Sequence, residues 1–165
     1  MSKNYLTNGD FGTGSFEGWQ VNEDYIKLIN TTQEVEGKHL NYFAGISPSP
    51  VSVGAVFQQV GVIDPGTYEL SFAHGAGIAG EQNPERFCVG GLTYVTADGL
   101  INGIAFDFVA KASLRYERLR VVIPARAQPI RMAFGVNVLG FQDSARKPTV
   151  GPIVVGDFEL VRVSD

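Results

Sequence analysis

The chain has 165 residues, of which 44% are hydrophobic and 11% aromatic, and its formal net charge is −4. This length predicts a single domain over 1–165 with a sizeable core, and the apolar content argues against disorder. The 13 Lys and Arg against 17 Asp and Glu exclude the basic surface that nucleic acid requires, and no apolar run is as long as a membrane span.

Short segments with strand character fill the first half of the chain. Residues 5–10 end in the turn signal Asn-Gly-Asp, and residues 47–50 (SPSP) block both a helix and a central strand. The Asp64-Pro65-Gly66 sequence predicts a tight turn. After it, apolar residues at 68, 70 and 72 alternate with polar or small ones, as in a half-buried strand. Strands are therefore expected at 5–10, 19–21, 25–30, 40–46, 53–62 and 68–73.

The second half continues this pattern around two long loops. Residues 74–85 and 140–152 lack periodicity and predict exposed loops. The composition of 110–120 permits a helix, but only Leu114 and Leu119 would mark an apolar face. Strands are expected at 87–95, 104–108, 119–123, 130–136 and 153–163. Many short strands separated by turn signals predict an all-β fold, an antiparallel sandwich or barrel.

Residues 4–21 (NYLTNGDFGTGSFEGWQV) resemble the opening of carbohydrate-binding modules of the family four and nine type. The matching positions are Asn8, Gly9, Asp10, Phe11, Gly18 and Trp19. Residues 57–77 are similar to the central segment of that family, through Gln58 or Gln59, Pro65, Gly66, Tyr68, Leu70, Ser71 and Phe72. Residues 154–163 are similar to its closing strand at Asp157, Phe158 and Leu160, although Gly156 stands where the family has an Asp.

This resemblance implies an antiparallel β-sandwich of the jelly-roll type, like the galactose-binding domains. It also implies non-catalytic binding of an oligo- or polysaccharide, on a sheet face or at loop ends. One architecture hosts many ligands, so the residues themselves must support the function. At its family position Trp19 is expected to pack in the core more than to stack on a ligand.

A glycan site needs an aromatic plate for the apolar faces of the sugars and planar polar groups for their hydroxyls. The candidate plates are Tyr25, Tyr42, Tyr94 and Phe141. The candidate polar groups are His74, Gln82, Asn83, Glu85, Arg86 and Asn137. Most of them fall in or beside 74–86, so the site is predicted where this loop meets neighbouring strands. The alternative is a solvated loop, with the tyrosines packed in the core or at sheet edges.

The resemblance further implies a structural calcium between the N-terminal turn and the closing strand, held by Asp10 and Asp157. Calcium takes six to eight oxygen ligands. Gly12 stands where the family usually supplies a carboxylate, and whether Glu17 replaces it stays open. In the alternative, Asp10 accepts backbone N–H bonds within its own turn.

Catalysis has little support in the sequence. His39 and His74 have no obvious Ser or Cys partner motif, and residues 75–80 (GAGIAG) precede no predicted helix, as a dinucleotide site would require. The single cysteine, Cys88, lies in an apolar run and excludes an intramolecular disulfide. The chain is therefore predicted not to be an enzyme.

The alternative function is a structural or protein-interaction module of a phage or surface assembly, and a homo-oligomer stays open. No secretory signal is seen at the N-terminus. The compartment stays open among the cytoplasm, a virion and a fragment of a secreted protein.

Overall fold

The computed structural model describes residues 3–21, 26–46, 55–76, 85–96, 100–123, 127–136 and 153–164. For β9 and most of β4 and β6 the description covers the backbone only. Ten strands follow one another along the chain: β1 (Gln20–Val21), β2 (Ile26–Val35), β3 (Lys38–Ile46), β4 (Ala55–Ile63), β5 (Gly66–Ala76), β6 (Glu85–Thr96), β7 (Ile101–Lys111), β8 (Arg115–Ile123), β9 (Ala127–Val136) and β10 (Ile153–Ser164). None of the described segments forms a helix of the length and hydropathy that a membrane crossing requires.

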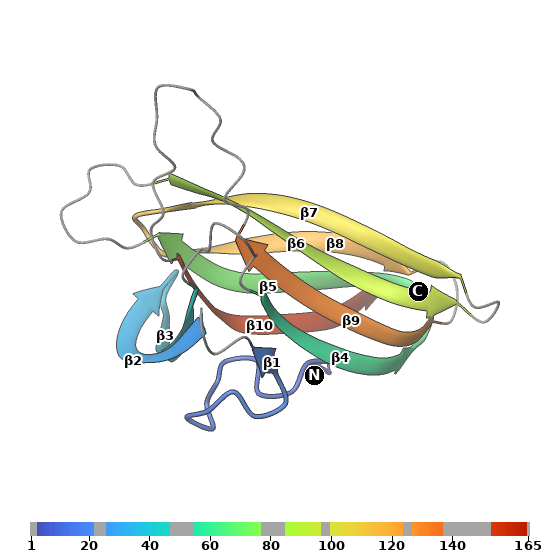
Figure 1. Ribbon diagram of the computed structural model, residues 1–165, viewed down its shortest axis with the longest axis horizontal. Coiled ribbons are helices and arrows are strands. Elements are labelled where there is room, and N and C mark those ends of the chain that lie inside the picture. Colours follow the sequence, from blue (N-terminus) through green and yellow to red (C-terminus); the bar gives the residue numbers. More distant parts are fainter. Residues whose placement is uncertain are drawn as a thin grey trace.

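The strands form two antiparallel sheets that pack face to face as a jelly-roll sandwich, which confirms the predicted fold class (Figure 1). Sheet I has the order β1-β4-β9-β6-β7, and sheet II has the order β2-β3-β10-β5-β8. The strand β10 lies between β3 and β5. It therefore joins the β2–β3 pair to the β5–β8 pair, whose strands all come earlier in the sequence.

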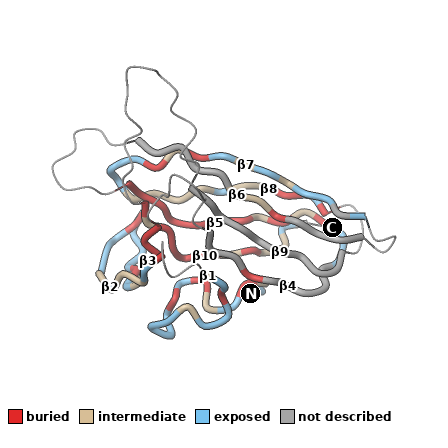
Figure 2. The backbone as a smooth tube through the Cα atoms, in the orientation of Figure 1, coloured by how far each residue is buried: buried red, intermediate tan, exposed pale blue. Residues whose placement is uncertain are grey.

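The alternation in β5 works as predicted. Tyr68, Leu70 and Phe72 are all fully buried, and they contribute to the core between the sheets with residues of β8 and β10 (Figure 2). Apolar burial of this kind is the main stabilising contribution to a sandwich. The matching prediction for 130–136 falls on side chains outside the described residues. The backbone register of β9 nevertheless pairs Met132 with the buried Leu92.

A second, smaller core lies on the outer side of sheet II. It consists of Val35, Leu40, Phe43 and Ala73, covered by the β2–β3 hairpin. Glu36 and Gly37 turn this hairpin with positive φ angles of 49° and 87°, the backbone that a tight two-residue turn requires. The hairpin tip reaches across the sheet, since Glu36 Oε2 accepts a hydrogen bond from the Tyr116 backbone N–H at 2.7 Å.

Two expectations for local structure are wrong. Residues 5–10 form no strand, and the segment is joined to β10 by isolated contacts: a bridge between Asn4 and Val161 and backbone hydrogen bonds of Tyr5 and Gly9. The backbone turns there because Asn8 and Phe11 adopt left-handed φ angles of 49° and 55°. Residues 74–76 were expected in an exposed loop, but they belong to β5, which continues to Ala76. The helix that composition permitted at 110–120 is absent, and these residues end β7 and begin β8.

Candidate functional site

The N-terminal loop is organised by the side chain of Asn8. Its Nδ2 donates to the carbonyl oxygens of Ser15 and Glu17, each at 3.0 Å, and its Oδ1 accepts from the Thr13 N–H at 3.2 Å. Asparagine suits this position because it tolerates a left-handed backbone and its amide both donates and accepts. The Asn8 side chain is therefore committed to the loop itself.

The aromatic residues of the same segment enter the core. Phe11 is fully buried, and Trp19 is 7% exposed with its ring centroid 5.1 Å from that of Phe158. The indole Nε1 donates to the Asn8 carbonyl at 2.9 Å, which satisfies its only polar atom. Trp19 therefore packs, as its sequence position predicted, and offers no plate to a ligand.

Gln58 is a second internal anchor. It is 4% exposed, and its side-chain amide bonds both backbone groups of Thr7, with Oε1 accepting at 2.8 Å and Nε2 donating at 2.9 Å. The bonds fasten the N-terminal segment to β4. Of the two glutamines in the resemblance, Gln58 thus has a structural role.

The two predicted metal ligands lie in adjacent segments. The Phe158 N–H donates to the Gly9 carbonyl at 2.9 Å, which brings the residue before Asp10 next to the residue after Asp157. Asp10 is exposed, and its Oδ1 accepts the Gly12 N–H at 2.9 Å. This bond is the turn role that was considered as the alternative for Asp10.

Asp157 is the centre of a polar group under the β2–β3 hairpin, here called the Asp157 cluster (Lys38, Tyr116, Asp157 and Glu159). Asp157 is 6% exposed and sits at an irregularity of β10 with a φ of 50°. Its Oδ2 accepts from Lys38 Nζ at 2.8 Å and from Tyr116 Oη at 2.7 Å. Lys38 Nζ also lies 3.9 Å from Glu159 Oε1.

The electrostatics of this cluster favour an ammonium ion and a neutral phenol. Partial burial acts to lower the pKa of Lys38, but the hydrogen bond to Asp157 and the negative charges of Asp157, Glu159 and Asp10 outweigh it and raise that pKa. Burial, followed by the bond to Asp157, raises the pKa of Tyr116 well above its ordinary value. Lys38 therefore stays charged and Tyr116 stays a donor.

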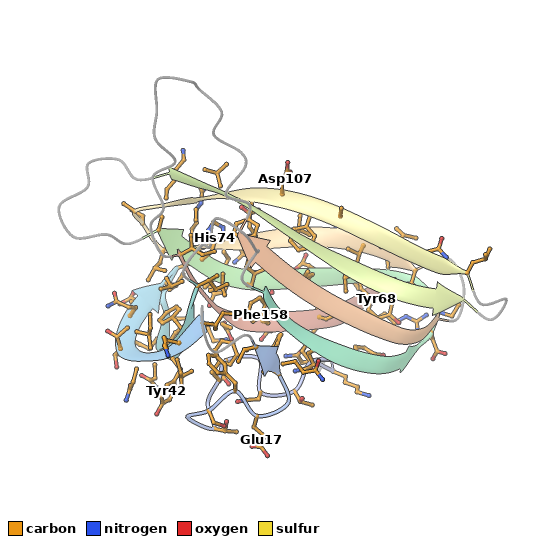
Figure 3. The ribbon with its side chains drawn as sticks, in the orientation of Figure 1. Glu17, Tyr42, Tyr68, His74, Asp107 and Phe158 are labelled. Atoms are coloured by element: carbon orange, nitrogen blue, oxygen red, sulfur yellow. The ribbon has the colours of Figure 1, made fainter. Side chains whose placement is uncertain are left out.

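The residues present do not fit a calcium site. The Asp157 Oδ2 atom already accepts two hydrogen bonds, one of them from an ammonium group. Among the described residues, no group of three or more His, Cys, Asp or Glu side chains could surround a metal ion. Glu17 is exposed on the N-terminal loop and labelled in Figure 3. Calcium takes six to eight oxygen ligands, and the described residues contribute no cluster of carboxylates toward them.

A second polar group, the His74 cluster (His74, Arg115 and Glu117), lies between the sheets near the start of β8. His74 is fully buried, and its Nε2 lies 3.1 Å from Glu117 Oε1. Its ring packs against Phe108 and Phe72, with centroids at 4.8 and 5.7 Å. Arg115 Nη2 donates to the Val109 carbonyl at 2.7 Å, which ties the edge of sheet II to that of sheet I.

This burial gives His74 no exposed surface in the structure, and its contact with a glycan stays a prediction. Desolvation lowers the pKa of His74 below 6.5, and Arg115 lowers it further, although Glu117 acts in the opposite direction. The Nδ1 atom has no hydrogen-bond partner among the described residues. His74 was placed in a loop, but it continues the alternation of β5 inward, so the core receives its ring.

The other predicted ligand residues are only partly described. Tyr42 is half-buried, and its hydroxyl lies 3.5 Å from where a Cβ on Gly14 would stand. Outside the described residues lie Tyr25, Gln82, Asn83, Asn137 and Phe141. For Glu85, Arg86 and Tyr94 the structure gives the backbone of β6, where their pairing partners are Lys111, Ala110 and Asn102.

The register of β6 separates these three residues. Side chains alternate between the two faces of a strand, and Arg86 and Tyr94 occupy the register of the buried Leu92. Glu85 belongs to the other register, with Asp107 of the neighbouring strand among its exposed members. By backbone position, Glu85 is thus out of register with Arg86 and Tyr94.

The backbone rows of sheet I that include the exposed Gln20, Gly103, Ala105 and Asp107 contain many small residues. One row across the sheet runs through Gln20, Phe57, Ala133, Gly91 and Ala105. A second runs through Gln59, Arg131, Thr93 and Gly103, and a third through Ala55, Gly135, Val89 and Asp107. Gln20, Gly103, Ala105 and Asp107 are exposed, and Asp107 points away from the core in Figure 3. Small residues in the middle of a sheet leave room for a ligand against the backbone.

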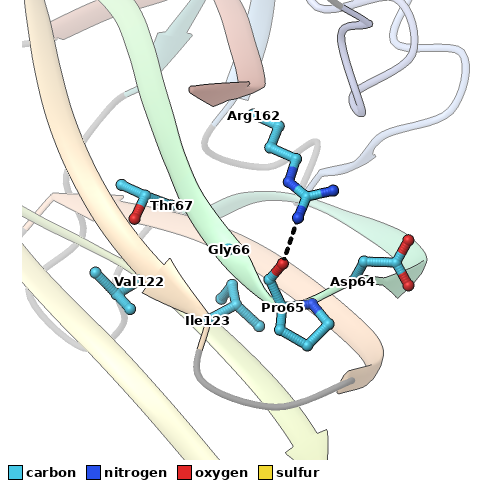
Figure 4. A pocket seen from close by; sticks show the side chains of 7 residues that line it. All are labelled: Asp64, Pro65, Gly66, Thr67, Val122, Ile123 and Arg162. Atoms are coloured by element: carbon cyan, nitrogen blue, oxygen red, sulfur yellow. Dashed lines mark hydrogen bonds between the residues drawn. The ribbon is translucent and has the colours of Figure 1, made fainter. Parts of the chain in front are cut away.

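An open pocket of about 580 Å³ lies where β5 begins, at the opposite end of that strand from residue 76. It is lined by Asp64, Pro65, Gly66, Thr67, Val122, Ile123 and Arg162. Figure 4 shows Arg162 Nη2 donating to the Pro65 carbonyl, at 2.8 Å. The Tyr68 hydroxyl donates to the Asp64 carbonyl at 2.7 Å, so both bonds brace the predicted turn.

No family model and no curated protein matches this chain. Solved structures match nearly all of it. The enzymatically active domain of tailspike protein 4 from bacteriophage CBA120 matches with a TM-score of 0.70 and 12% identity, over 97% of this chain and 21% of that one. A family 22 xylan-binding domain from Paenibacillus barcinonensis matches with a TM-score of 0.60 and 15% identity, over 99% of each chain.

A family 61 carbohydrate-binding module in complex with β-1,4-galactotriose matches with a TM-score of 0.57 and 17% identity, over 98% of this chain and 100% of that one. Modules of families 4 and 16 share the fold as well. The fold is thus that of carbohydrate-binding modules, and these matches do not single out the family four and nine type. The chain spans about a fifth of the tailspike protein it matches.

Proposed function

We propose that this chain binds an oligo- or polysaccharide without catalysing a reaction on it. The observation that carries the proposal is its fold, which it shares with a galactotriose-bound module and with xylan-binding domains across nearly its whole length. Fold alone does not determine function, so the surface must also suit a sugar.

The outer face of sheet I is the surface we propose for the glycan, at the end where residues 77–84 connect β5 to β6. Its small residues suit the flat C–H face of a sugar ring, and its exposed Gln20 and Asp107 are planar groups that can bond pairs of hydroxyls. The predicted ligand residues Gln82, Asn83 and Glu85 belong to the same end of the sheet in this proposal.

A glycan array probed with the free protein tests the function, and calorimetry on the best glycan tests the surface. Asp107→Ala should weaken binding about tenfold, the loss of roughly one good hydrogen-bonded pair. Glu34→Ala, which removes an exposed carboxylate of the β2–β3 hairpin, is the matched control. Arg86→Ala and Tyr94→Ala test the other register of β6, and loss of affinity in those two alone would move the site there.

The same experiment tests the absence of catalysis. The array glycans that bind should be recovered intact after long incubation, with no new reducing ends. Release of reducing ends by the wild-type protein would show a hydrolase and would overturn this part of the proposal.

A second candidate function is a module of a phage or surface assembly, favoured by the TM-score of 0.70 to the tailspike protein. It predicts no binding on the array and a defined oligomer or complex in solution. Light scattering coupled to size-exclusion chromatography distinguishes the two, because a glycan-binding module needs no partner copy.

A further inference from the structure

The Asp157 cluster concentrates negative charge where the N-terminal turn meets the closing strand. Asp157 is nearly completely buried, Glu159 is two residues along β10, and the charge of Asp10 also acts on Lys38. A buried carboxylate without a partner is strongly unfavourable. Some positive charge must therefore accompany this junction in the folded protein.

The chain supplies that charge from the β2–β3 hairpin. Lys38 is the first residue after the Glu36-Gly37 turn, and its Nζ is 2.8 Å from Asp157 Oδ2. The hairpin tip is itself held in place, because Glu36 accepts from the Tyr116 N–H at 2.7 Å and lies 3.4 Å from Arg118 Nη2. The ammonium group is thus positioned by the backbone of a tight turn.

Tyr116 completes the arrangement from the opposite edge of the sheet. Its hydroxyl donates to the same Asp157 oxygen at 2.7 Å. Three elements therefore converge on one carboxylate: the hairpin through Lys38, β8 through Tyr116 and β10 through Asp157 itself. A divalent cation could join these elements in the same way, with oxygen ligands in place of the ammonium group.

We infer that Lys38 is the built-in cation of this junction and that it takes the place of a structural divalent metal. The ammonium group neutralises Asp157, holds the hairpin against β10 and makes the stability of the sandwich independent of calcium. Nζ lies within hydrogen-bond distance of the carboxylate, so a calcium ion binding Asp157 Oδ2 would first have to displace Lys38.

Thermal unfolding tests this assignment. The wild-type protein should show one Tm in calcium chloride and in EDTA, and titration with calcium chloride should give no binding heat. Lys38→Met removes the charge but keeps most of the side chain, and it should lower the Tm by about 5 °C. Lys27→Met, an exposed lysine on the same hairpin, is the control and should leave the Tm unchanged.

Two further variants separate loss of charge from loss of packing. Asp157→Asn removes the charge that Lys38 compensates, so adding Lys38→Met to it should lower the Tm much less than Lys38→Met does alone. Lys38→Arg keeps the charge and should retain both the Tm and the indifference to calcium, which keeps the test open if Lys38→Met does not fold. The inference would be overturned if the wild-type Tm rose with calcium. It would also be overturned if Lys38→Met had the same Tm as Lys27→Met.

Discussion

The Asp157 cluster and the His74 cluster both bury a titratable side chain, but they do so in opposite ways. Asp157 lies under the hairpin on the outer side of sheet II, where an ammonium group and a phenol donate hydrogen bonds to its carboxylate. His74 lies between the sheets and is kept neutral, because desolvation outweighs the nearby Glu117. The two sites are parts of one sheet, separated by its thickness.

The difference follows from the groups that surround the buried side chain on each side of sheet II. On the outer side, the long side chain of Lys38 reaches the carboxylate of Asp157, and the lysine side chain stays partly exposed to water. Between the sheets, His74 is packed against Phe72 and Phe108, which offer no charge. Burial in such a place favours the neutral form of the imidazole, although Glu117 acts in the opposite direction.

The largest effect is expected at Phe72, which touches both regions. Its ring is stacked on Phe158, the neighbour of Asp157, at 5.5 Å and packs against His74 at 5.7 Å. Phe72→Ala should lower the free energy of unfolding by about 3–5 kcal/mol, through lost burial and the cavity left behind. Urea denaturation measures this value. Leu100→Ala is the control, because Leu100 is 62% exposed and should change stability little; equal losses in both would contradict the assigned core.

A smaller effect is expected from the outer cluster. Tyr116→Phe removes one of the two donors to Asp157 Oδ2 and leaves Lys38 in place. A hydrogen bond to a charged group contributes about 1.5–3 kcal/mol, and urea denaturation should show a loss in this range. Tyr42→Phe leaves the cluster unchanged and serves as the control. No difference between the two variants would mean that Lys38 alone compensates Asp157.

The smallest effect is a pH dependence that belongs to the inner cluster. The pKa of His74 is lower in the folded protein than its unfolded value of 6.5, so the unfolded chain binds the proton more readily. The contribution of neutral His74 to the free energy of unfolding is fully present above pH 6.5, and it is lost as the pH falls through the folded-state pKa of His74. Urea midpoints measured from about pH 7.5 down to pH 5 should decrease.

His74→Gln should make that decrease shallower, because the titrating group is gone. His39→Gln removes an exposed histidine of β3 and should keep the wild-type slope. If both variants followed the wild-type profile, another group would be responsible for the pH dependence.

The sequence predicts what depends on local pattern. The alternation of Tyr68, Leu70 and Phe72 predicts a half-buried strand, and these residues are buried as expected. The same alternation carries His74 inward, but the lack of periodicity in 74–85 predicted that the strand had already ended. The expected end of the strand before residue 74 was wrong, because β5 continues through Gly75 and Ala76, which pair with Val154 and Ile153 of β10.

The sequence does not predict contacts between distant segments. Lys38 and Asp157 are separated by 119 positions, and the Glu-Gly-Lys turn reads as an ordinary solvated hairpin. The resemblance identified Asp10 and Asp157 but could not include the lysine that approaches them. It also could not show that Asn8, Trp19 and Gln58 serve the fold, since that depends on their bonds and burial.

The central position of β10 has a consequence for the order in which the chain can fold. During synthesis the β2–β3 hairpin and β5 and β8 emerge well before β10, yet only β10 joins them into one sheet. The N-terminal segment also depends on β10, because Tyr5 and Gly9 form hydrogen bonds with the backbone of Leu160 and Phe158. Most contacts that complete sheet II therefore close very long loops, which slows folding. A nascent chain without β10 leaves the β3 and β5 edges of sheet II unpaired.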